Sequence, residues 1–267
     1  MWACPHCQQV LEPVTGESAW CCTNGHRFDR AREGYVNLLA GNRKGSKQPG
    51  DSAEMIAARR RVHEAGVYAP LVEGMTDLLG IEPAPATVLE LGCGEGYYCA
   101  AMDRCYPSAR VRGVDISRAA VRRAAKTHPG ISFAVASNFD LPLPDASQDL
   151  VLRIFAPSDP AQLLRVLAPG GRYLQVGPAP SHMWELRQAL YDEPREHPAA
   201  AESHPGLLLL SHAEVVYRVD LDRALLADVV AMTPFAWRGH REKRARLLSS
   251  DGLSLQLALS LHLFVKG

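Results

Sequence analysis

The sequence predicts an α/β fold in which a Rossmann-like, mainly parallel sheet of seven strands follows a small N-terminal zinc ribbon. Three observations lead to this prediction. Short apolar runs alternate with helical periodicity after Pro85, a glycine-rich turn follows the first of those runs, and cysteines pair with a histidine in the first 26 residues. With 267 residues, the chain is long enough for one large domain and a small appendage.

The elements are expected in the alternating order of a doubly wound sheet. The expected strands are Thr87–Leu91, Val111–Val114, Ile131–Ala136, Leu150–Ile154, Arg172–Val176, Val215–Val219 and a last one with leucine at every second position from 253 to 263. The expected helices are a segment beginning at Ser52, Tyr97–Cys105, a Ser117-capped segment reaching about Lys126, Pro160–Leu167, Ser181–Asp192 and Asp222–Met232. We divide the chain into a zinc-binding ribbon (1–35), a basic linker and helical segment (36–80) and the α/β domain (81–267).

Composition restricts the class of function. Lys and Arg number 29, as do Asp and Glu, so any nucleic-acid surface must be a local patch. The N-terminus lacks the pattern of a secretory signal, and no apolar run approaches the roughly 20 residues that span a bilayer. The seven cysteines fit metal ligands and reduced thiols better than a disulfide framework. We therefore expect a cytoplasmic protein with no membrane partner.

The glycine-rich turn predicts an S-adenosylmethionine (SAM) site and hence a class I SAM-dependent methyltransferase fold. Gly92, Gly94 and Gly96 alternate directly after the first strand, which ends near Glu90. Asp115 follows Gly96 by 19 residues at the end of the next strand, where a carboxylate can accept the ribose hydroxyls of a nucleoside. A chance glycine turn and an NAD site are the alternatives, but NAD sites prefer a Gly-x-Gly-x-x-Gly spacing.

One part of this pattern is incomplete. The acidic residue that often follows the third strand is absent, and Ser137 and Asn138 occupy its place. Asn138, or backbone amides near it, is therefore expected to contact the adenine.

The N-terminal cysteines predict a structural zinc site. Cys4 and Cys7 form a C-x-x-C pair, and Cys22 and His26 form a second pair after 14 intervening residues. Four such ligands close a tetrahedral Cys₃His site with no open position. Cys21 is an alternative to Cys22 as the third thiolate.

Two clusters of basic residues indicate contact with nucleic acid. Between His26 and Arg61, nine basic residues oppose four acidic ones, a local excess that suits phosphates. Near the C-terminus, aromatic and basic residues alternate in a way that suits stacking on unpaired bases. A solvated charged face is the alternative for both clusters. The candidate RNA contacts are Arg43, Lys44, Lys47, Arg59, Arg60, Phe155, Trp237 and Arg238.

These motifs together resemble the bacterial 23S rRNA (guanine-N1-)-methyltransferases, and the resemblance spans nearly the whole chain. It rests on the ribbon and on the segments Phe28-Asp29, Glu33–Leu39, Pro49–Met55, Leu91–Tyr98 and Met232–Arg238. It implies a guanine in the hairpin loop of helix 35 in 23S rRNA, at nucleotide 745 or, in the branch linked to macrolide resistance, at 748. The sequence looks nearer the 745-type, Gram-negative branch. The resemblance also implies a homodimer and SAM contacts at Tyr68, Gly94, Glu95 and His182.

The mechanism expected for such an enzyme needs removal of a proton from guanine N1, and His182 and Asp140 are the candidate bases. The segment Arg153–Pro157 differs from the Asn/Asp-Pro-Pro-Tyr motif of enzymes that methylate exocyclic amines, and Phe155 is placed to stack on the target base. Two other classes remain open: a small-molecule methyltransferase with an accessory ribbon, and a catalytically silent RNA-binding protein.

Overall fold

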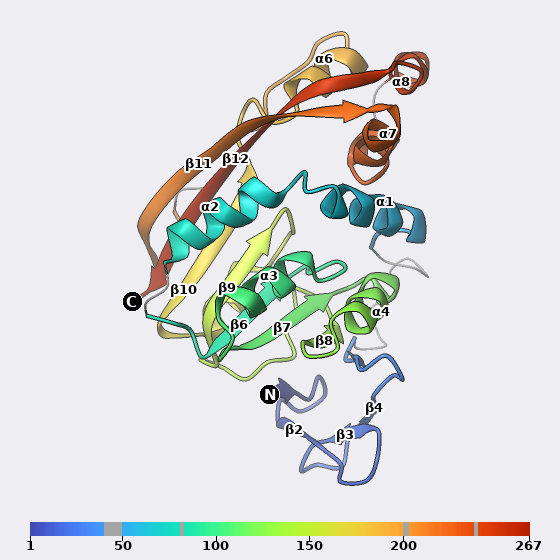
Figure 1. Cartoon of the computed structure of the whole chain (residues 1–267). Helices are drawn as coiled ribbons and strands as arrows, with labels where there is room; N and C mark the ends of the chain where they lie inside the picture. The colour runs from blue at the N-terminus through green and yellow to red at the C-terminus, as the bar shows by residue number, and fades with distance from the viewer. Residues whose placement is uncertain (40–49, 81–82, 200–202, 238–239) are drawn as a thin grey trace.

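The computed structural model describes residues 1–39, 50–80, 83–199, 203–237 and 240–267 (Figure 1). The ribbon contains β1 (Trp2–Ala3), β2 (Val10–Pro13), β3 (Ala19–Cys21) and β4 (Arg27–Asp29). The large sheet contains β5 (Val36–Asn37), β6 (Thr87–Leu91), β7 (Arg110–Asp115), β8 (Ser132–Val135), β9 (Gln148–Ile154), β10 (Leu167–Pro178), β11 (Leu207–Asp222) and β12 (Gly252–Lys266). The helices are α1 (Ala53–Glu64), α2 (Ala69–Leu79), α3 (Tyr97–Cys105), α4 (Arg118–Thr127), α5 (Pro160–Val166), α6 (Trp184–Leu190), α7 (Arg223–Ala231) and α8 (Arg241–Leu248), with a 3₁₀ turn at Pro234–Ala236.

The large sheet has the expected doubly wound topology. Within the described residues its strand order is β11-β12-β10-β9-β6-β7-β8-β5, and β10 through β5 are all parallel. β12 lies between β10 and β11 and runs antiparallel to both. Strands β6 to β12 are the seven predicted ones, and β5 adds an eighth at the edge beside β8.

Five features differ from the expected elements. β11 has 16 residues, where five were expected, because the leucines at 207–210 continue the edge strand. β12 is buried on both faces over most of its length, so its alternating leucines mark only one of two packed faces. Helices α2 and α8 and strand β5 were not anticipated, since they are short or lie in segments read as linker and loop.

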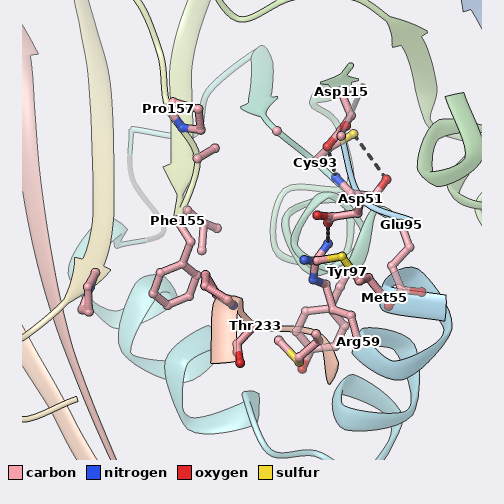
Figure 2. Close-up of a pocket in the computed structure, with 18 of the residues that line it drawn as sticks. Asp51, Met55, Arg59, Cys93, Glu95, Tyr97, Asp115, Phe155, Pro157 and Thr233 are labelled. Carbon is pink, nitrogen blue, oxygen red and sulfur yellow. Dashed lines mark hydrogen bonds and ion pairs between the residues drawn. The ribbon is translucent and has the colours of Figure 1, made fainter. Parts of the chain in front are cut away.

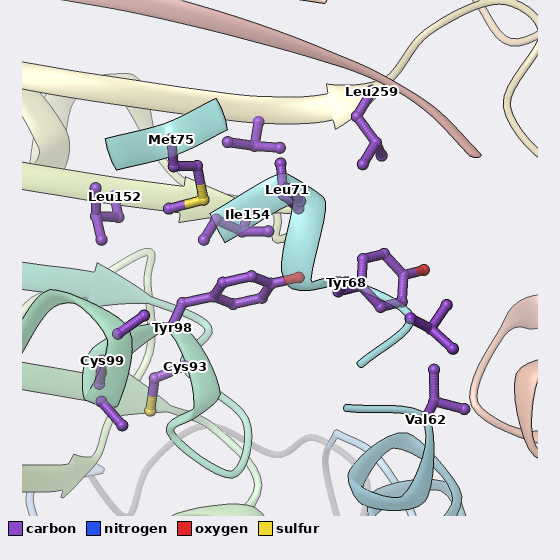
Figure 3. Packing of buried hydrophobic residues seen from close by; sticks show 14 of the residues in the cluster. Val62, Tyr68, Leu71, Met75, Cys93, Tyr98, Cys99, Leu152, Ile154 and Leu259 are labelled. Carbon is purple, nitrogen blue, oxygen red and sulfur yellow. The ribbon is translucent and has the colours of Figure 1, made fainter. Parts of the chain in front are cut away.

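Two apolar clusters cover the two faces of the sheet. One cluster joins α1, α2, α3, α4, α6 and α7 to the first face. Figure 3 shows Leu71 and Met75 of α2 packed near Leu152 and Ile154 of β9. In the part of the chain that the structure describes, no helix is long and apolar enough to cross a membrane.

The ribbon helps to cover the second face. Trp2, Cys4 and Leu11 are buried in one cluster with Leu89 of β6 and Val114 of β7. The indole Nε1 of Trp2 donates to Ser132 Oγ at 3.1 Å, and the backbone N–H of Ala3 donates to the carbonyl of Pro142 at 2.8 Å. The ribbon is therefore packed against the sheet rather than attached only through its C-terminal connection (Figure 1).

Candidate active site and zinc centre

A cavity of about 690 Å³ opens at the carboxyl ends of the parallel strands, where doubly wound sheets bind ligands. We call its two sides the cofactor half and the target half. Figure 2 shows Asp51, Glu95 and Asp115 on one side and Phe155 and Pro157 on the other. The cofactor half is lined by Asp51, Met55, Arg59, His63, Glu90, Gly92–Glu95, Asp115, Ile116 and Asn138. The target half is lined chiefly by Phe155, His182, Arg187, His197, Phe235 and Trp237.

The glycine loop requires glycine at Gly92 for two reasons. Its φ of +71° is a left-handed conformation, and a Cβ built there would lie 2.5 Å from the Cβ of Ala156. Gly96, at φ +85°, is the N-cap of α3 and packs against Phe133. The predicted strand–loop–helix arrangement is therefore present, with Gly92 holding the loop against the segment that follows β9.

Asp115 ties the loop to the next strand. One carboxylate oxygen accepts from the N–H of Gly94 at 2.9 Å and the other from the N–H of Ser117 at 2.7 Å. Burial raises the pKa of Asp115, and these two amides oppose that rise. Each oxygen keeps a further lone pair for a ribose hydroxyl.

Two buried acceptors in the cofactor half lack partners among the described residues. Glu90 is 2% exposed, and its Oε2 accepts no hydrogen bond. Burial raises the pKa of this carboxyl to about 8. Asn138 donates through Nδ2 to the carbonyl of Pro157 at 3.0 Å, whereas its Oδ1 is unpaired. An ammonium group and an aromatic amino group are suitable partners, and SAM carries both, so the residues present fit SAM.

Helix α1 contributes to the cavity a face that was not predicted from the sequence. Met55, Arg59 and His63, each four residues apart, all line the cavity. His63 Nδ1 lies 2.9 Å from Glu95 Oε1, and its ring stacks on Tyr97 with centroids 4.0 Å apart. Burial lowers the pKa of His63. The four-residue spacing of Met55, Arg59 and His63 is visible in the sequence and could have indicated that they share one face of the helix.

The apolar spacing of Met55, Ala58 and Val62 predicts that the three arginines of α1 lie on its outer face, and the structure corrects this for Arg59. Arg59 forms an ion pair with Asp51 inside the cavity. Arg60 pairs with Glu64 on the same helix, outside the cavity, and Arg61 pairs with Asp228 of α7 at 2.6 Å. All three guanidinium groups therefore already have carboxylate partners, which would compete with RNA phosphates.

Aromatic side chains remain exposed at the mouth of the target half. Phe155 is 46% exposed and has φ +55°, a strained conformation for a non-glycine residue that is often found at functional sites. Trp237 is 58% exposed, and Phe139, which was not predicted, is 50% exposed and lines the cavity near Asn138. The buried ring of Tyr68 meets Phe155 edge-on, with centroids 6.3 Å apart. The candidate contacts Arg43, Lys44, Lys47 and Arg238 lie outside the described residues.

The two candidate bases have different positions. His182 is buried in the target half, and its Nδ1 accepts the backbone N–H of Ala258 at 3.3 Å. The neutral ring therefore carries its proton on Nε2 and acts as a donor, which does not suit the expected role of base. Burial lowers the pKa of His182 to about 3. Asp140 is not among the residues that line the cavity, so its position gives no support to a role as base.

The zinc ligands converge as predicted. One ligand atom from each of Cys4, Cys7, Cys22 and His26 lies within 4.8 Å of the others. His26 Nδ1 is 3.5 Å from the Cys4 sulfur and 3.4 Å from the Cys22 sulfur. Zn–S bonds of about 2.3 Å give tetrahedral edges of about 3.8 Å, so the set fits a zinc ion. Cys22 is the third thiolate, because the Cys21 thiol instead faces the carbonyl of Cys22.

Comparison with known proteins agrees with this arrangement. Residues 2–47 match the family described as RlmA, N-terminal, a zinc ribbon, and residues 88–171 match a family described as methyltransferase domain. The 23S rRNA (guanine(748)-N(1))-methyltransferase of Streptomyces fradiae is 36% identical over 254 residues, which are 92% of this chain and 89% of that protein.

Two further relatives differ in how much of the chain they match. The Bacillus subtilis (strain 168) protein named "Putative 23S rRNA (guanine-N(1)-)-methyltransferase YxjB" is 32% identical over 91% of this chain and 89% of its own length. The malonyl-[acyl-carrier protein] O-methyltransferase of Hahella chejuensis is 30% identical over only 55% of this chain and 56% of its own length.

Proposed function

Because this chain belongs to the family of 23S rRNA (guanine-N1-)-methyltransferases, we propose that it methylates N1 of guanine 745 in the hairpin loop of helix 35. The observation that carries the proposal is one cavity with two unlike halves beside a zinc ribbon. The cofactor half offers carboxylates and a glycine loop to a nucleoside, and the target half offers aromatic rings to a base.

Different residues bind the cofactor and position the guanine. Three side chains accept hydrogen bonds from SAM: Asp115 from the ribose hydroxyls, Glu90 from the ammonium group and Asn138 from the adenine amino group. Glu95 lines the cofactor half, His182 lines the target half, and Tyr68 packs edge-on against Phe155. When bound, SAM would supply a methyl group on its sulfonium, and an in-line nucleophile would take that methyl group as the thioether leaves. The protein's main task is then to hold an unpaired guanine in attack geometry, with Phe155 and Trp237 as the stacking partners.

The proposed partner is 23S rRNA, bound by a homodimer. Arg43, Lys44, Lys47 and Arg238 are the proposed phosphate contacts, with Arg59 and Arg60 available only if their ion pairs open. The edge strand β11 exposes Leu208, Leu209 and Leu210, which is consistent with a protein contact along this edge. Sedimentation of the purified protein tests the dimer.

A methylation assay on a synthetic helix 35 hairpin tests the substrate. We expect digestion of the product to yield N1-methylguanosine, and expect no methyl transfer when guanine 745 is replaced by adenosine. An unmethylated hairpin, or transfer to a metabolite in the absence of RNA, would contradict the proposal and favour the small-molecule class.

Guanine 748 is the second candidate, favoured by the similarity to the Streptomyces fradiae enzyme. Replacing guanine 748 instead of 745 distinguishes the two. Binding of SAM and RNA without any transfer would identify a catalytically silent RNA-binding protein.

A further inference from the structure

The acidic groups of the cavity all lie in the cofactor half. Asp51 is paired with Arg59, Glu95 with His63, and Asp115 with the N–H groups of Gly94 and Ser117. Glu90 is buried at the end of β6, beneath the glycine loop. Among the described residues that line the target half there is no carboxylate. A carboxylate base for guanine N1 is therefore missing where the guanine is expected.

The target half instead holds a cation without a counter-ion. Arg187 of α6 lines the cavity, and within the described residues no ion pair joins it to a carboxylate. Its Nη2 contacts the ring nitrogens of His197 at 2.6 and 3.0 Å, its Nη1 donates to the carbonyl of Arg195, and its buried Nε has no partner.

Two acids on the surrounding elements are already engaged, and two others, Glu193 and Glu196, are exposed to solvent. Glu185 of α6 pairs with Arg218 of β11 at 2.8 Å, and Asp192 pairs with His240 and with Lys243 of α8. Burial lowers the pKa of Arg187, and burial together with Arg187 lowers the pKa of His197 to about 4. A partly buried cation surrounded by neutral imidazoles favours an incoming anion.

His182 adds a neutral donor beside this cation. Its ring lies 5.9 Å from His197 and 6.0 Å from Phe155, centroid to centroid. The backbone N–H of Ala258 fixes Nδ1 as the acceptor, which leaves Nε2–H as the donor. The next residue, Met183, has φ +55° at the N-cap of α6, so a strained turn holds the imidazole in place.

We propose that the target guanine reacts as its N1-deprotonated anion, whose charge on O6 is held by Arg187 and by the Nε2–H of His182. The N1 proton goes to solvent. The N1 electron pair then forms the N–CH₃ bond while the S–CH₃ bond breaks and its pair stays on sulfur. Anion and sulfonium charges cancel, which leaves N1-methylguanine, a neutral thioether and one proton in solution. The inference rests on the proposed function and adds how the enzyme activates its base.

The test is the pH dependence of single-turnover methylation of the helix 35 hairpin by wild type, Arg187→Gln and Arg187→Lys. A second hairpin carries 8-azaguanine, whose N1 is more acidic, at the target position. For wild type we expect a rate that rises with pH and levels off below the pKa of free guanosine measured in the same buffers. Arg187→Gln should raise the pH midpoint of this rate profile. At neutral pH it should lower the methylation rate about 100-fold on the guanine hairpin, but much less on the 8-azaguanine hairpin. The midpoint and the rate of Arg187→Lys should lie between those of wild type and Arg187→Gln.

Binding of the hairpin, measured with S-adenosylhomocysteine present, separates the alternatives. If Arg187→Gln weakens RNA binding and leaves the midpoint unchanged, Arg187 contacts a phosphate and the inference is wrong. If Arg187→Gln lowers the methylation rate by the same factor at every pH and on both hairpins, the inference is likewise wrong, since such a loss indicates a structural role. If the wild type methylates neither hairpin at any pH, the proposed function itself fails, and the inference fails with it.

Discussion

At the scale of single residues, the site depends on positions where backbone conformation and close contact coincide. Gly92 combines a left-handed φ with contact to Ala156, and through that contact the cofactor loop and the segment after β9 are held together. Phe155 and Met183 adopt left-handed conformations without the freedom of glycine, and both line the target half. Strain concentrated around one cavity is what a pre-organised site requires.

Gly92→Ala should weaken cofactor binding strongly, and Gly170→Ala is its matched control. Both glycines have φ +71°, so both variants carry the same strain of about 1–2 kcal/mol. Only at Gly92 does the new Cβ meet Ala156, whereas at Gly170 nothing lies within 4 Å. Calorimetry with S-adenosylhomocysteine should show a loss of affinity of about 100-fold, or about 3 kcal/mol, for Gly92→Ala alone. Equal affinities for the two variants would contradict the loop geometry.

The buried His182 should make the fold sensitive to acid. Its folded pKa of about 3 lies below the unfolded value of 6.5, so the stability it contributes is complete above pH 6.5 and is lost as the pH falls toward 3. Between pH 7 and pH 5 this amounts to about 2 kcal/mol.

Urea unfolding of wild type and His182→Asn at both pH values measures this effect. The raised pKa of Glu90 makes the unfolding free energy change with pH in the opposite direction. This effect is the same in wild type and variant, so it cancels in the difference between their unfolding free energies. The gap in unfolding free energy between wild type and variant should shrink by about 2 kcal/mol at pH 5. A constant gap would show that His182 is not buried as a neutral ring.

At the scale of elements, the sequence predicted the parts whose signals are local. Strand β6 and helix α3 have the expected bounds, because an apolar run and a glycine turn define them. The chain's linker segment was harder to interpret, since α2, β5 and the inward face of α1 depend on packing against distant strands. His63 and Arg187 were missed for the same reason, because their importance comes from neighbours remote in sequence.

The ribbon is the element whose role changed most once its contacts were known. It contributes Trp2 and Leu11 to the core of the second face, so we expect zinc to stabilise the α/β domain as well. Cys22→Ser should abolish stoichiometric zinc and lower the melting temperature by roughly 10 °C, since uncovering Trp2 alone costs about 3 kcal/mol.

Cys21→Ser is the control, because the Cys21 thiol donates to the carbonyl of Cys22 and does not belong to the converging ligand set. It should keep both the zinc and the melting temperature. Zinc content is read by atomic absorption and unfolding by calorimetry. Unfolding of the ribbon alone in Cys22→Ser, with an unchanged main transition, would mean that the two parts fold independently.

At the scale of the whole molecule, the ribbon packs against the same sheet whose strand ends form the cavity. The net charge of zero argues against RNA binding by general attraction and in favour of a local surface. We propose that this surface presents one guanine of 23S rRNA to the cavity.

Primer extension on 23S rRNA from cells with and without this gene maps N1-methylguanine and tests whether this guanine is the substrate. N1 methylation blocks base pairing, so reverse transcriptase stops beside the modified base. We predict a stop next to guanine 745 that disappears when the gene is deleted and returns with the wild-type gene. The same stop pattern around helix 35 in both strains would contradict the account.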